Sequence, residues 1–252
     1  MKTTKRSLSY WLLYLAMPVL VLIIWQGLAV AGIIKPYTMP APSAIVKAAI
    51  QYGESGKLAA YIGISVLRVI EGFLAGLVVA FILGIASGLS RRVEIFTDFC
   101  LQILRPIPPI AWIPLAILWF GIGELSKIYI IFVGAFFPVF VTIVDGIKAI
   151  DKKYYELAQV YEVPKKQFIL HIIIPGALPA IMTGIRVGMG NAWVCVVAAE
   201  MIGATKGVGF MLMDGRSLSR PDIVILGMLL VGCIGKIMDD VLLYIRRRVV
   251  VR

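Results

Sequence analysis

The stretch that decides the fold is residues 58–90, which read LAAYIGISVLRVIEGFLAGLVVAFILGIASGLS. Its only charged side chains are Arg68 and Glu71, and it is longer than the roughly 20 apolar residues that a helix needs to cross a bilayer. Small residues recur in it at every fourth position, namely Gly72, Gly76, Ala80, Gly84 and Gly88. This spacing places them on one helix face, where a second helix can approach closely. The stretch therefore predicts a transmembrane helix with a packing seam.

The composition of the whole chain agrees with a membrane protein. Of its 252 residues, 60% are hydrophobic and 15% are charged, and the mean hydropathy is +0.94. A soluble domain carries about a quarter charged residues and about half apolar ones. One core cannot hide such an excess, so most of the surface must face lipid. The composition excludes a soluble enzyme, a secreted disulfide scaffold and a disordered tail.

Six apolar segments are long enough to cross a bilayer. They are residues 10–31, 58–90, 99–121, 126–148, 172–203 and 222–245. The first exceeds the about 7–15 apolar residues of a signal peptide, so we expect it to stay in the mature protein. The fifth has its own small-residue seam, formed by Gly176, Ala180, Gly184, Gly188 and Ala192. Both seams predict close helix packing, and sliding along them during a transport cycle is compatible with the pattern. We expect an all-α membrane protein with six transmembrane helices and a single domain over 1–252, its core at 58–245.

The loop charges predict the orientation, because Lys and Arg gather on the cytoplasmic side. With the N-terminus inside, the cytoplasmic segments hold twice as many Lys and Arg as the outer ones. The inner set is Lys2, Lys5, Arg6, Arg91, Arg92, Lys148, Lys152, Lys153, Lys165, Lys166, Arg246, Arg247, Arg248 and Arg252; the outer set is Lys35, Lys47, Lys57, Lys127, Lys206, Arg216 and Arg220. This bias predicts a multi-pass protein with both termini in the cytoplasm. The net charge of +11 then reflects topology, and nucleic acid is not an expected partner.

No pattern of catalytic or metal-ligating residues occurs. The three cysteines, Cys100, Cys195 and Cys233, lie in apolar stretches without ligand spacing, and His171 is the only histidine. The sequence has no Gly-x-x-x-x-Gly-Lys-Ser/Thr loop, so it lacks that cradle for ATP phosphates. We expect no metal, no bound cofactor and no enzymatic activity.

The third apolar segment starts with an unusual run, Arg105-Pro-Ile-Pro-Pro-Ile-Ala-Trp-Ile-Pro114. Four prolines in nine residues prevent a regular helix entry. Broken backbone at membrane depth is tolerated only inside protein or against a cavity. The run is therefore either a packed kink or part of a pathway wall.

Ionisable residues within the spans are candidate functional residues. Arg68 with Glu71, and Lys236 with Asp239 or Asp240, are spaced to neutralise each other locally. Arg186 and Glu200 lack a close sequence partner, so they either pair across helices or line a pathway. The candidates for pathway lining are Arg105, Pro108, Trp112, Arg186, Asn191 and Glu200.

Two predicted outer loops are distinctive. In residues 32–57, Ser43 is a fair N-cap for a short helix through Ile50. A second loop holds Lys206, Asp214, Arg216, Arg220 and Asp222, and it either meets a binding protein or is simply solvated.

The predicted cytoplasmic loop, residues 149–171, is the most polar part of the chain. Asp151 is spaced to cap a helix that carries Tyr154, Leu157, Ala158 and Tyr161 on one face. Pro164 suits the first turn of a second short helix, with Phe168, Ile169 and Ile172 on its apolar side. The first apolar face either lies against the protein's own bundle or docks a cytoplasmic partner.

This loop resembles the EAA loop of bacterial ATP-binding-cassette importer permeases. That pattern is Glu-Ala-Ala, three residues, Gly, nine residues and Ile-x-Leu-Pro, and Glu156, Ala158, Ile172 and Pro175 match it. Glu162 stands where the family has Gly. A Gly would permit a left-handed turn, and another residue there is strained by about 1 kcal/mol. Either this turn has another geometry or the strain is tolerated.

Further stretches are similar to the nitrate, sulfonate and taurine branch of the same family. They are residues 104–127, Ala198-Ala-Glu200, Gly207-Val-Gly209, Asp214-Gly-Arg216 and Arg220-Pro-Asp222. The resemblance spans about residues 35–245. It implies a type I importer bundle in the inner membrane: a homodimer of permeases with two ATPase subunits, which use ATP and Mg, and an extracytoplasmic substrate-binding protein.

The resemblance also implies roles for residues and a class of cargo. The coupling loop that docks the ATPase would comprise Tyr154, Glu156, Leu157, Ala158, Tyr161, Glu162, Pro164, Phe168 and Pro175. Taurine or another sulfonate is the first expected cargo, with nitrate or bicarbonate next and a thiamine-precursor pyrimidine further off. An ion-coupled secondary transporter is disfavoured because the spans hold few unpaired acidic residues, and a membrane enzyme because no catalytic cluster occurs.

Overall fold

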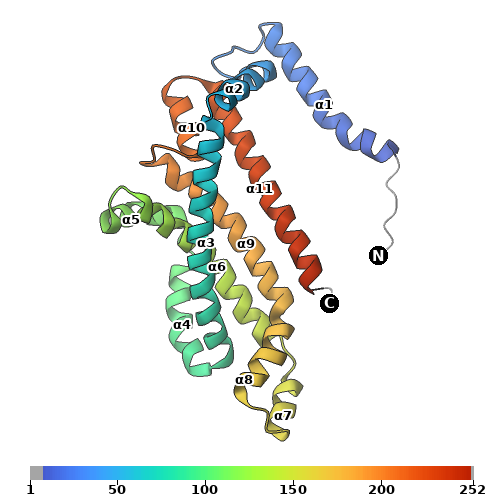
Figure 1. Cartoon of the computed structure of the whole chain (residues 1–252), viewed down its shortest axis with the longest axis vertical. Helices are drawn as coiled ribbons and strands as arrows, with labels where there is room; N and C mark the ends of the chain where they lie inside the picture. Colours follow the sequence, from blue (N-terminus) through green and yellow to red (C-terminus); the bar gives the residue numbers. More distant parts are fainter. Residues whose placement is uncertain (1–7, 251–252) are drawn as a thin grey trace. The chain divides into compact units, whose positions relative to one another are not determined.

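The computed structural model describes residues 8–250, with the backbone alone for residues 8–15, and every regular element in this range is a helix (Figure 1). In chain order these are α1 (Leu8–Val30), α2 (Pro42–Glu54), α3 (Lys57–Leu89), α4 (Arg91–Leu104), the 3₁₀ turn η1 (Pro109–Trp112), α5 (Ile113–Phe120), α6 (Glu124–Lys148), α7 (Lys152–Val160), α8 (Lys165–Phe168), the π-helical turn η2 (Ile169–Ile173), α9 (Ile174–Met201), α10 (Val208–Ser217) and α11 (Pro221–Val250). The predicted all-α fold is confirmed. Lys2, Lys5, Arg6 and Arg252 of the predicted inner charge lie outside the described residues.

The chain forms two compact units, one of residues up to 60 with 211–230, and the other of residues 61–210 with 231 onward. In the first unit, Gln26 of α1 holds the start of α2. Its amide nitrogen donates to the Ser43 hydroxyl and its amide oxygen accepts from the Ser43 backbone N–H, both at 3.1 Å. The prediction that Ser43 is the N-cap of this helix is wrong. Ala41 is the N-cap, because Pro42, which has no N–H to lose, takes the first helical position.

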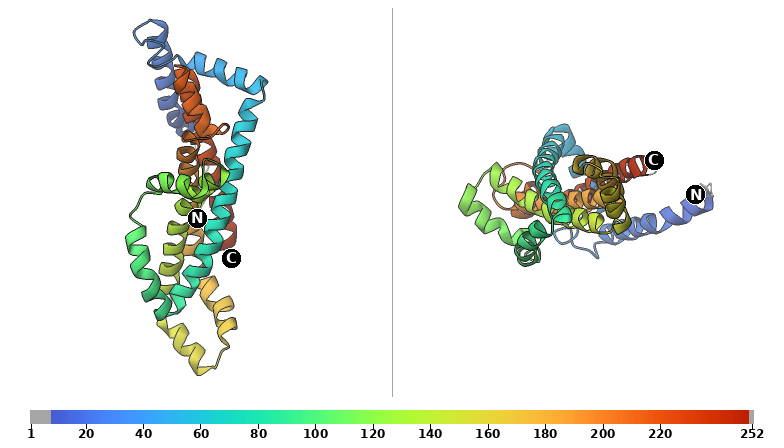
Figure 2. Two further views of the ribbon diagram at one scale, coloured as in Figure 1. Left: turned by 90° about the vertical axis from the view of Figure 1, so that its left-hand side faces the viewer. Right: turned by 90° about the horizontal axis from the view of Figure 1, so that it is seen from below.

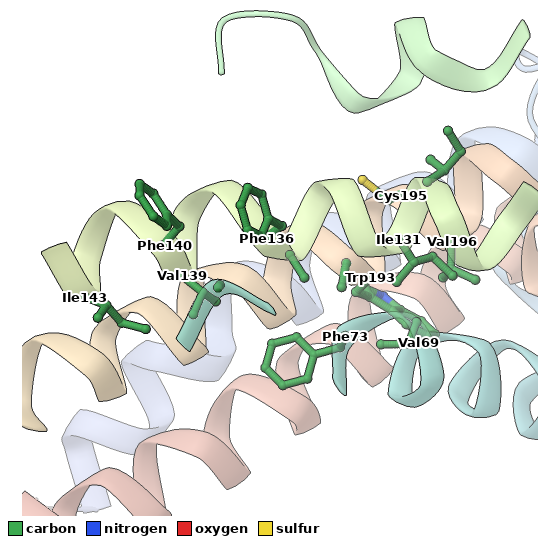
Figure 3. Packing of buried hydrophobic residues seen from close by; sticks show 14 of the residues in the cluster. Val69, Phe73, Ile131, Phe136, Val139, Phe140, Ile143, Trp193, Cys195 and Val196 are labelled. Carbon is green, nitrogen blue, oxygen red and sulfur yellow. The ribbon is translucent and has the colours of Figure 1, made fainter. Parts of the chain in front are cut away.

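Helix α6 is the central element of the second unit. Of the residues in its most apolar stretch, 67% are buried, compared with 33% for α3 and 28% for the segment Lys165–Met201. Its side chains Ile131, Val139 and Ile143 are fully buried, and they form a core with Val69 of α3 and Val196 of α9 (Figure 3). The helix hairpin of α7 and α8 lies beyond the ends of α6 and α9 (Figure 2).

The small-residue seams of α3 and α9 both face α6. A Cβ added at Gly72 would lie 2.7 Å from Ile131, and one at Gly84 would lie 2.9 Å from Ile143. On α9, a Cβ at Gly188 would lie 2.6 Å from Val139. Any side chain at these positions would push the helices apart, so the predicted close packing is confirmed.

Four helical segments of the described chain are long and apolar enough to cross a membrane: α3, α6, Lys165–Met201 and α11. The predicted third span is not one straight helix. Helix α4 ends at Leu104, and the pair formed by α4 and Pro109–Phe120 bends by 88° across the proline run, which supplies a possible fifth span. In α1, residues Ala16–Val30 form a shorter apolar helix. The count of six spans stays a prediction.

The seam on α3 can be tested at Gly76. Its added Cβ would lie 2.9 Å from the carbonyl oxygen of Phe132 and 3.1 Å from Ala135, both on α6. Gly76→Ala should therefore lower the free energy of unfolding by about 1–3 kcal/mol, measured by thermal unfolding in detergent. The control is Gly63→Ala, on the same helix, where no atom lies within 4 Å of the added carbon. Equal melting temperatures for the two variants would contradict the packing.

Candidate functional site

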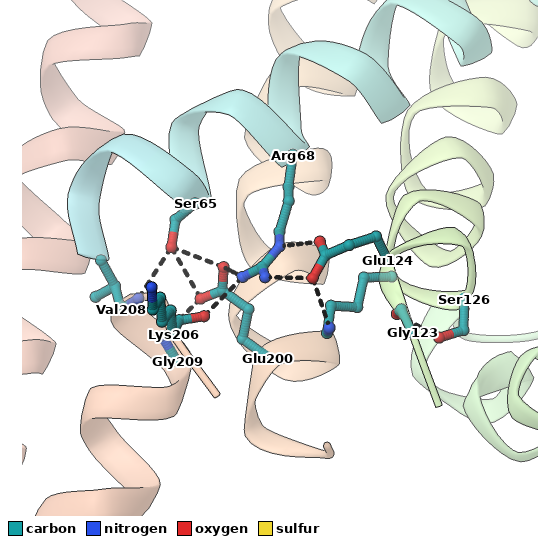
Figure 4. A network of polar contacts seen from close by, with 10 residues as sticks. Ser65, Arg68, Gly123, Glu124, Ser126, Glu200, Lys206, Val208 and Gly209 are labelled. Atoms are coloured by element: carbon teal, nitrogen blue, oxygen red, sulfur yellow. Dashed lines mark hydrogen bonds and ion pairs between the residues drawn. The ribbon is translucent and has the colours of Figure 1, made fainter. Parts of the chain in front are cut away.

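A buried network of polar groups, which we call the Arg68 network, joins α3, α6, α9 and α10 (Figure 4). The Arg68 guanidinium donates to both carboxylate oxygens of Glu124, at 2.6 and 2.7 Å, and to Glu200 at 2.7 Å. Lys127 approaches Glu124 at 3.1 Å. Arg68 is 3% exposed and Glu200 is 1% exposed. Two cations and two carboxylates thus neutralise each other: Arg68, Lys127 and Glu200 are buried and need partners, and the Glu124 side chain is 55% exposed.

The same network holds the start of α10. The backbone N–H of Val208 donates to the Ser65 hydroxyl at 2.9 Å, and that of Gly209 donates to the Glu200 carboxylate at 2.8 Å. These two groups satisfy N–H donors that the first turn of a helix leaves unpaired. Gly207 has φ +130°, and a Cβ added there would lie 2.4 Å from the Glu200 carboxylate. The Gly207-Val-Gly209 stretch is therefore part of this network.

The structure replaces the predicted partner of Arg68, and it pairs Arg186 and Lys236 in ways that the sequence allows. Arg68 pairs with Glu124 and Glu200, whereas Glu71, its predicted partner, is exposed. Arg186 pairs across helices with Asp239 of α11, its second nitrogen lying 2.7 Å from a carboxylate oxygen. Lys236 pairs with Asp240, as the spacing predicted.

The six candidates for pathway lining lie in different places. Arg105 and Asn191 line one cavity, of 360 Å³, between the proline run, α6 and α9. Arg186 lines a separate cavity of 270 Å³, and Glu200 belongs to the Arg68 network. Pro108 and Trp112 line neither cavity of the described chain.

The proline run forms one wall of the first cavity. Ile107 and Pro109 face it together with Arg105, and the opposite wall comes from residues of α6 and α9 such as Val133, Phe137 and Val187. This agrees with the expectation that broken backbone at membrane depth lies against a cavity.

The predicted coupling loop consists of α7, α8 and the turn between them. Asp151 caps α7, since its carboxylate accepts from the Lys153 backbone N–H at 2.9 Å. Tyr155 and Phe168 pack together with ring centroids 5.1 Å apart, and burial raises the pKa of the Tyr155 phenol. Pro164 precedes α8 as its N-cap rather than lying in the first turn. The hairpin is thus fixed by its own ring contact.

Most of the apolar face of α7 is exposed in the part of the chain that the structure describes. Tyr154 and Leu157 are each 52% exposed and Tyr161 is 76% exposed, while Glu156 and Pro175 are also exposed. Of the two alternatives for this face, packing against the protein's own bundle is therefore not the one seen. The residue of α7 that packs inward is Tyr155, which the helical pattern did not single out.

Glu162 has a left-handed backbone, with φ +51°. The Val163 N–H donates to the Ala158 carbonyl at 2.9 Å, and the Glu162 N–H donates to the Gln159 carbonyl at 3.2 Å. This pair of bonds is the Schellman motif that ends many helices, where Gly is preferred at the left-handed position. The turn keeps the geometry that suits a Gly, and Glu162 accepts the strain.

Two residues of these sites, Ser65 and Asp239, could not be recognised as site residues from the sequence pattern. Ser65 is three residues before Arg68, so both lie on one face of α3, but a single Ser in an apolar span indicates nothing by itself. The local spacing indicates Asp239 only as a partner for Lys236, not for Arg186. Their contacts join residues far apart in the chain, which local spacing does not reveal.

Several helices long and apolar enough to span a bilayer, around a buried charge network and a cavity walled by broken backbone, define a multi-pass membrane protein. The family model for binding-protein-dependent transport system inner membrane components matches residues 72–251. The chain belongs to this family, and it is a transport permease rather than an enzyme.

Curated relatives cover most of the chain. The aliphatic sulfonates transport permease protein SsuC of Bacillus subtilis is 39% identical over 94% of this chain and 86% of its own length. The taurine transport system permease protein TauC of Escherichia coli is 33% identical over 90% and 84%. The nitrate import permease protein NrtB of Synechocystis is 34% identical over 74% and 68%. The predicted branch of the family is confirmed.

A solved structure of the MetNI methionine ABC transporter, in inward-facing conformation, has the same fold. The match has a TM-score of 0.66 and covers 73% of this chain and 92% of that one, at 16% identity. The predicted importer-permease fold is confirmed.

The Arg68 network predicts a large loss of stability when its cation is removed. Arg68→Met leaves the buried Glu200 carboxylate without its cation and the half-exposed Glu124 carboxylate with Lys127 alone, which should cost roughly 3–5 kcal/mol of unfolding free energy. The control is Arg91→Met in the predicted cytoplasmic segment, where the Arg91 side chain is 77% exposed and Glu94 keeps Lys148 as a partner, so the cost should be under about 1 kcal/mol. Thermal unfolding in detergent measures both, and a smaller effect for Arg68 than for Arg91 would contradict the network.

The left-handed turn predicts that Glu162→Gly stabilises the loop. Relief of the strain should be worth about 1 kcal/mol, which slows amide exchange at Val163 about fivefold. Hydrogen exchange followed by mass spectrometry measures this. The matched control is Glu156→Gly, inside α7, which should speed exchange because Gly weakens a helix interior. Faster exchange in both variants would rule out the strained turn.

Proposed function

We propose that the chain is the membrane subunit of an ATP-binding-cassette importer for a small anion, with taurine or another sulfonate first. The observation that carries this proposal is the exposed apolar face of α7, formed by Tyr154, Leu157 and Tyr161, in the loop that resembles the EAA motif. An apolar face exposed to water on a loop is typical of a surface that another protein covers. The partner is a separate ATPase, which binds ATP and Mg, while this chain binds no cofactor.

In the proposed assembly, two copies of the whole chain, each acting as one permease domain, pair with two ATPase subunits and receive cargo from an extracytoplasmic binding protein. Both termini and the α7–α8 hairpin lie in the cytoplasm. Sulfonates rank above nitrate because the sulfonate and taurine relatives match 90% or more of this chain and the nitrate relative matches 74%. Nitrate or bicarbonate is the second candidate.

Docking is tested by co-purification. Leu157→Asp puts a charge into the α7 face and should abolish recovery of the co-expressed ATPase with the tagged permease. The control is Leu218→Asp, a leucine of similar exposure, 58% against 52%, in the loop after α10. ATPase recovery unchanged by Leu157→Asp, or transport that continues without any ATPase, would defeat the proposal.

The cargo is tested with the cognate binding protein and the reconstituted complex. Taurine, an alkanesulfonate, nitrate and bicarbonate are supplied in turn, and ATP hydrolysis is measured. Taurine or the alkanesulfonate should stimulate hydrolysis at the lowest concentration. Stimulation by nitrate or bicarbonate alone would replace the sulfonate assignment and keep the importer.

A further inference from the structure

Arg105 differs from the other cations of the predicted spans in having no carboxylate partner. Arg68, Arg186 and Lys236 each form an ion pair. Among the side chains that the structure describes, those of residues 16–250, Arg105 has no ion-pair or hydrogen-bond partner, and it is exposed. An unpaired charge at membrane depth is costly, so it marks a group that meets something other than protein.

Arg105 stands between two cavities. It follows the last residue of α4, at the bend, and lines both the 360 Å³ cavity described above and a neighbouring one of 430 Å³. Phe137 and Val141 of α6 also line both. A solute that moves from one cavity to the other along α6 therefore passes the guanidinium.

The two cavities differ in charge. Of the described residues that line the 360 Å³ cavity, Arg105 alone has an ionisable side chain. The 430 Å³ cavity also has three carboxylates, Glu94, Asp98 and Asp145, and the cation Lys148. Glu94 is bound by Lys148 and Arg91, and Asp98 accepts from Gln102. The first cavity thus presents one net positive charge, and it is the one suited to an anion.

The other residues that line the 360 Å³ cavity indicate which class of anion would fit it. The Asn191 amide is a neutral donor, whereas the Thr142 hydroxyl donates to carbonyls of its own helix and so offers only lone pairs. The remaining wall is apolar, with Val133, Phe137 and Val187 among its residues. A guanidinium fork matches an oxyanion with two parallel hydrogen bonds, and the apolar wall suits a short carbon chain.

We propose that Arg105 is the charge-selecting residue of the pathway, and that it binds the oxyanion head of a small organic anion, such as a sulfonate, in the 360 Å³ cavity. The proposal rests on the proposed importer function. It assigns part of the selectivity to the permease itself, at the bend between α4 and α5, and not to a binding protein alone.

The test uses the full complex in proteoliposomes, with labelled taurine and the binding protein. Arg105→Gln should lower taurine uptake about 10- to 100-fold, because a charge-assisted hydrogen bond in a low-dielectric cavity is lost. ATP hydrolysis stimulated by the loaded binding protein should stay within about twofold, because the α7 face is intact. The control is Arg92→Gln, an exposed cation of α4 that lines neither cavity and should leave uptake unchanged.

A charge-restoring series keeps the proposal falsifiable if Arg105→Gln folds poorly. Arg105→Cys is made with Cys100 and Cys233 changed to Ser, and is then modified with a cationic or an anionic methanethiosulfonate reagent. The cationic adduct should recover uptake at least about fivefold over the anionic one. Equal uptake by the two adducts, or wild-type uptake by Arg105→Gln, overturns the assignment of Arg105. Failure of wild-type complex to couple any anion to ATP hydrolysis overturns the importer function instead.

Discussion

The close approach of α3 and α9 to the central helix α6 is the contact on which the rest of the second unit depends. Lipid tails are as apolar as the side chains, so burial alone does not bring these helices together. Close contact between helix backbones holds these helices together, and it requires helix faces lined by Gly. Gly72 and Gly84 provide one such face and Gly188 the other. The Arg68 network and two walls of the 360 Å³ cavity are built on residues that these three helices place.

The charged groups inside the second unit follow from this packing. Once α3, α6 and α9 are in contact, Arg68, Glu124 and Glu200 meet at distances of 2.6–2.7 Å, and α10 can begin on the Glu200 carboxylate. Such a neutral cluster is tolerated in a low-dielectric setting because each charge has its partner. Arg105 lies outside this cluster, at the bend between α4 and the proline run, and there its guanidinium faces a cavity rather than a carboxylate.

Local patterns predicted the local features well. The spacing of small residues gave the seams, the Asp151 cap is present, and the family Gly at position 162 pointed to a left-handed turn that Glu162 does adopt. Ion-pair partners that are distant in the sequence could not be predicted from local spacing. The spacing predicts Glu71 as the partner of Arg68, whereas the partners in the structure, Glu124 and Glu200, are 56 and 132 residues away. The sequence predicts the third span as one segment, because composition alone does not reveal the 88° bend between α4 and Pro109–Phe120.

The π-helical turn η2 joins α8 and α9 without a break in the helical backbone. Residues Lys165–Met201 therefore form one helical rod of 37 residues, about 55 Å long. Helix α6 packs against the middle of this rod, along the seam that includes Gly188. The rod places the α7–α8 hairpin at one end of a continuous helical segment and Glu200, whose carboxylate holds the start of α10, at the other.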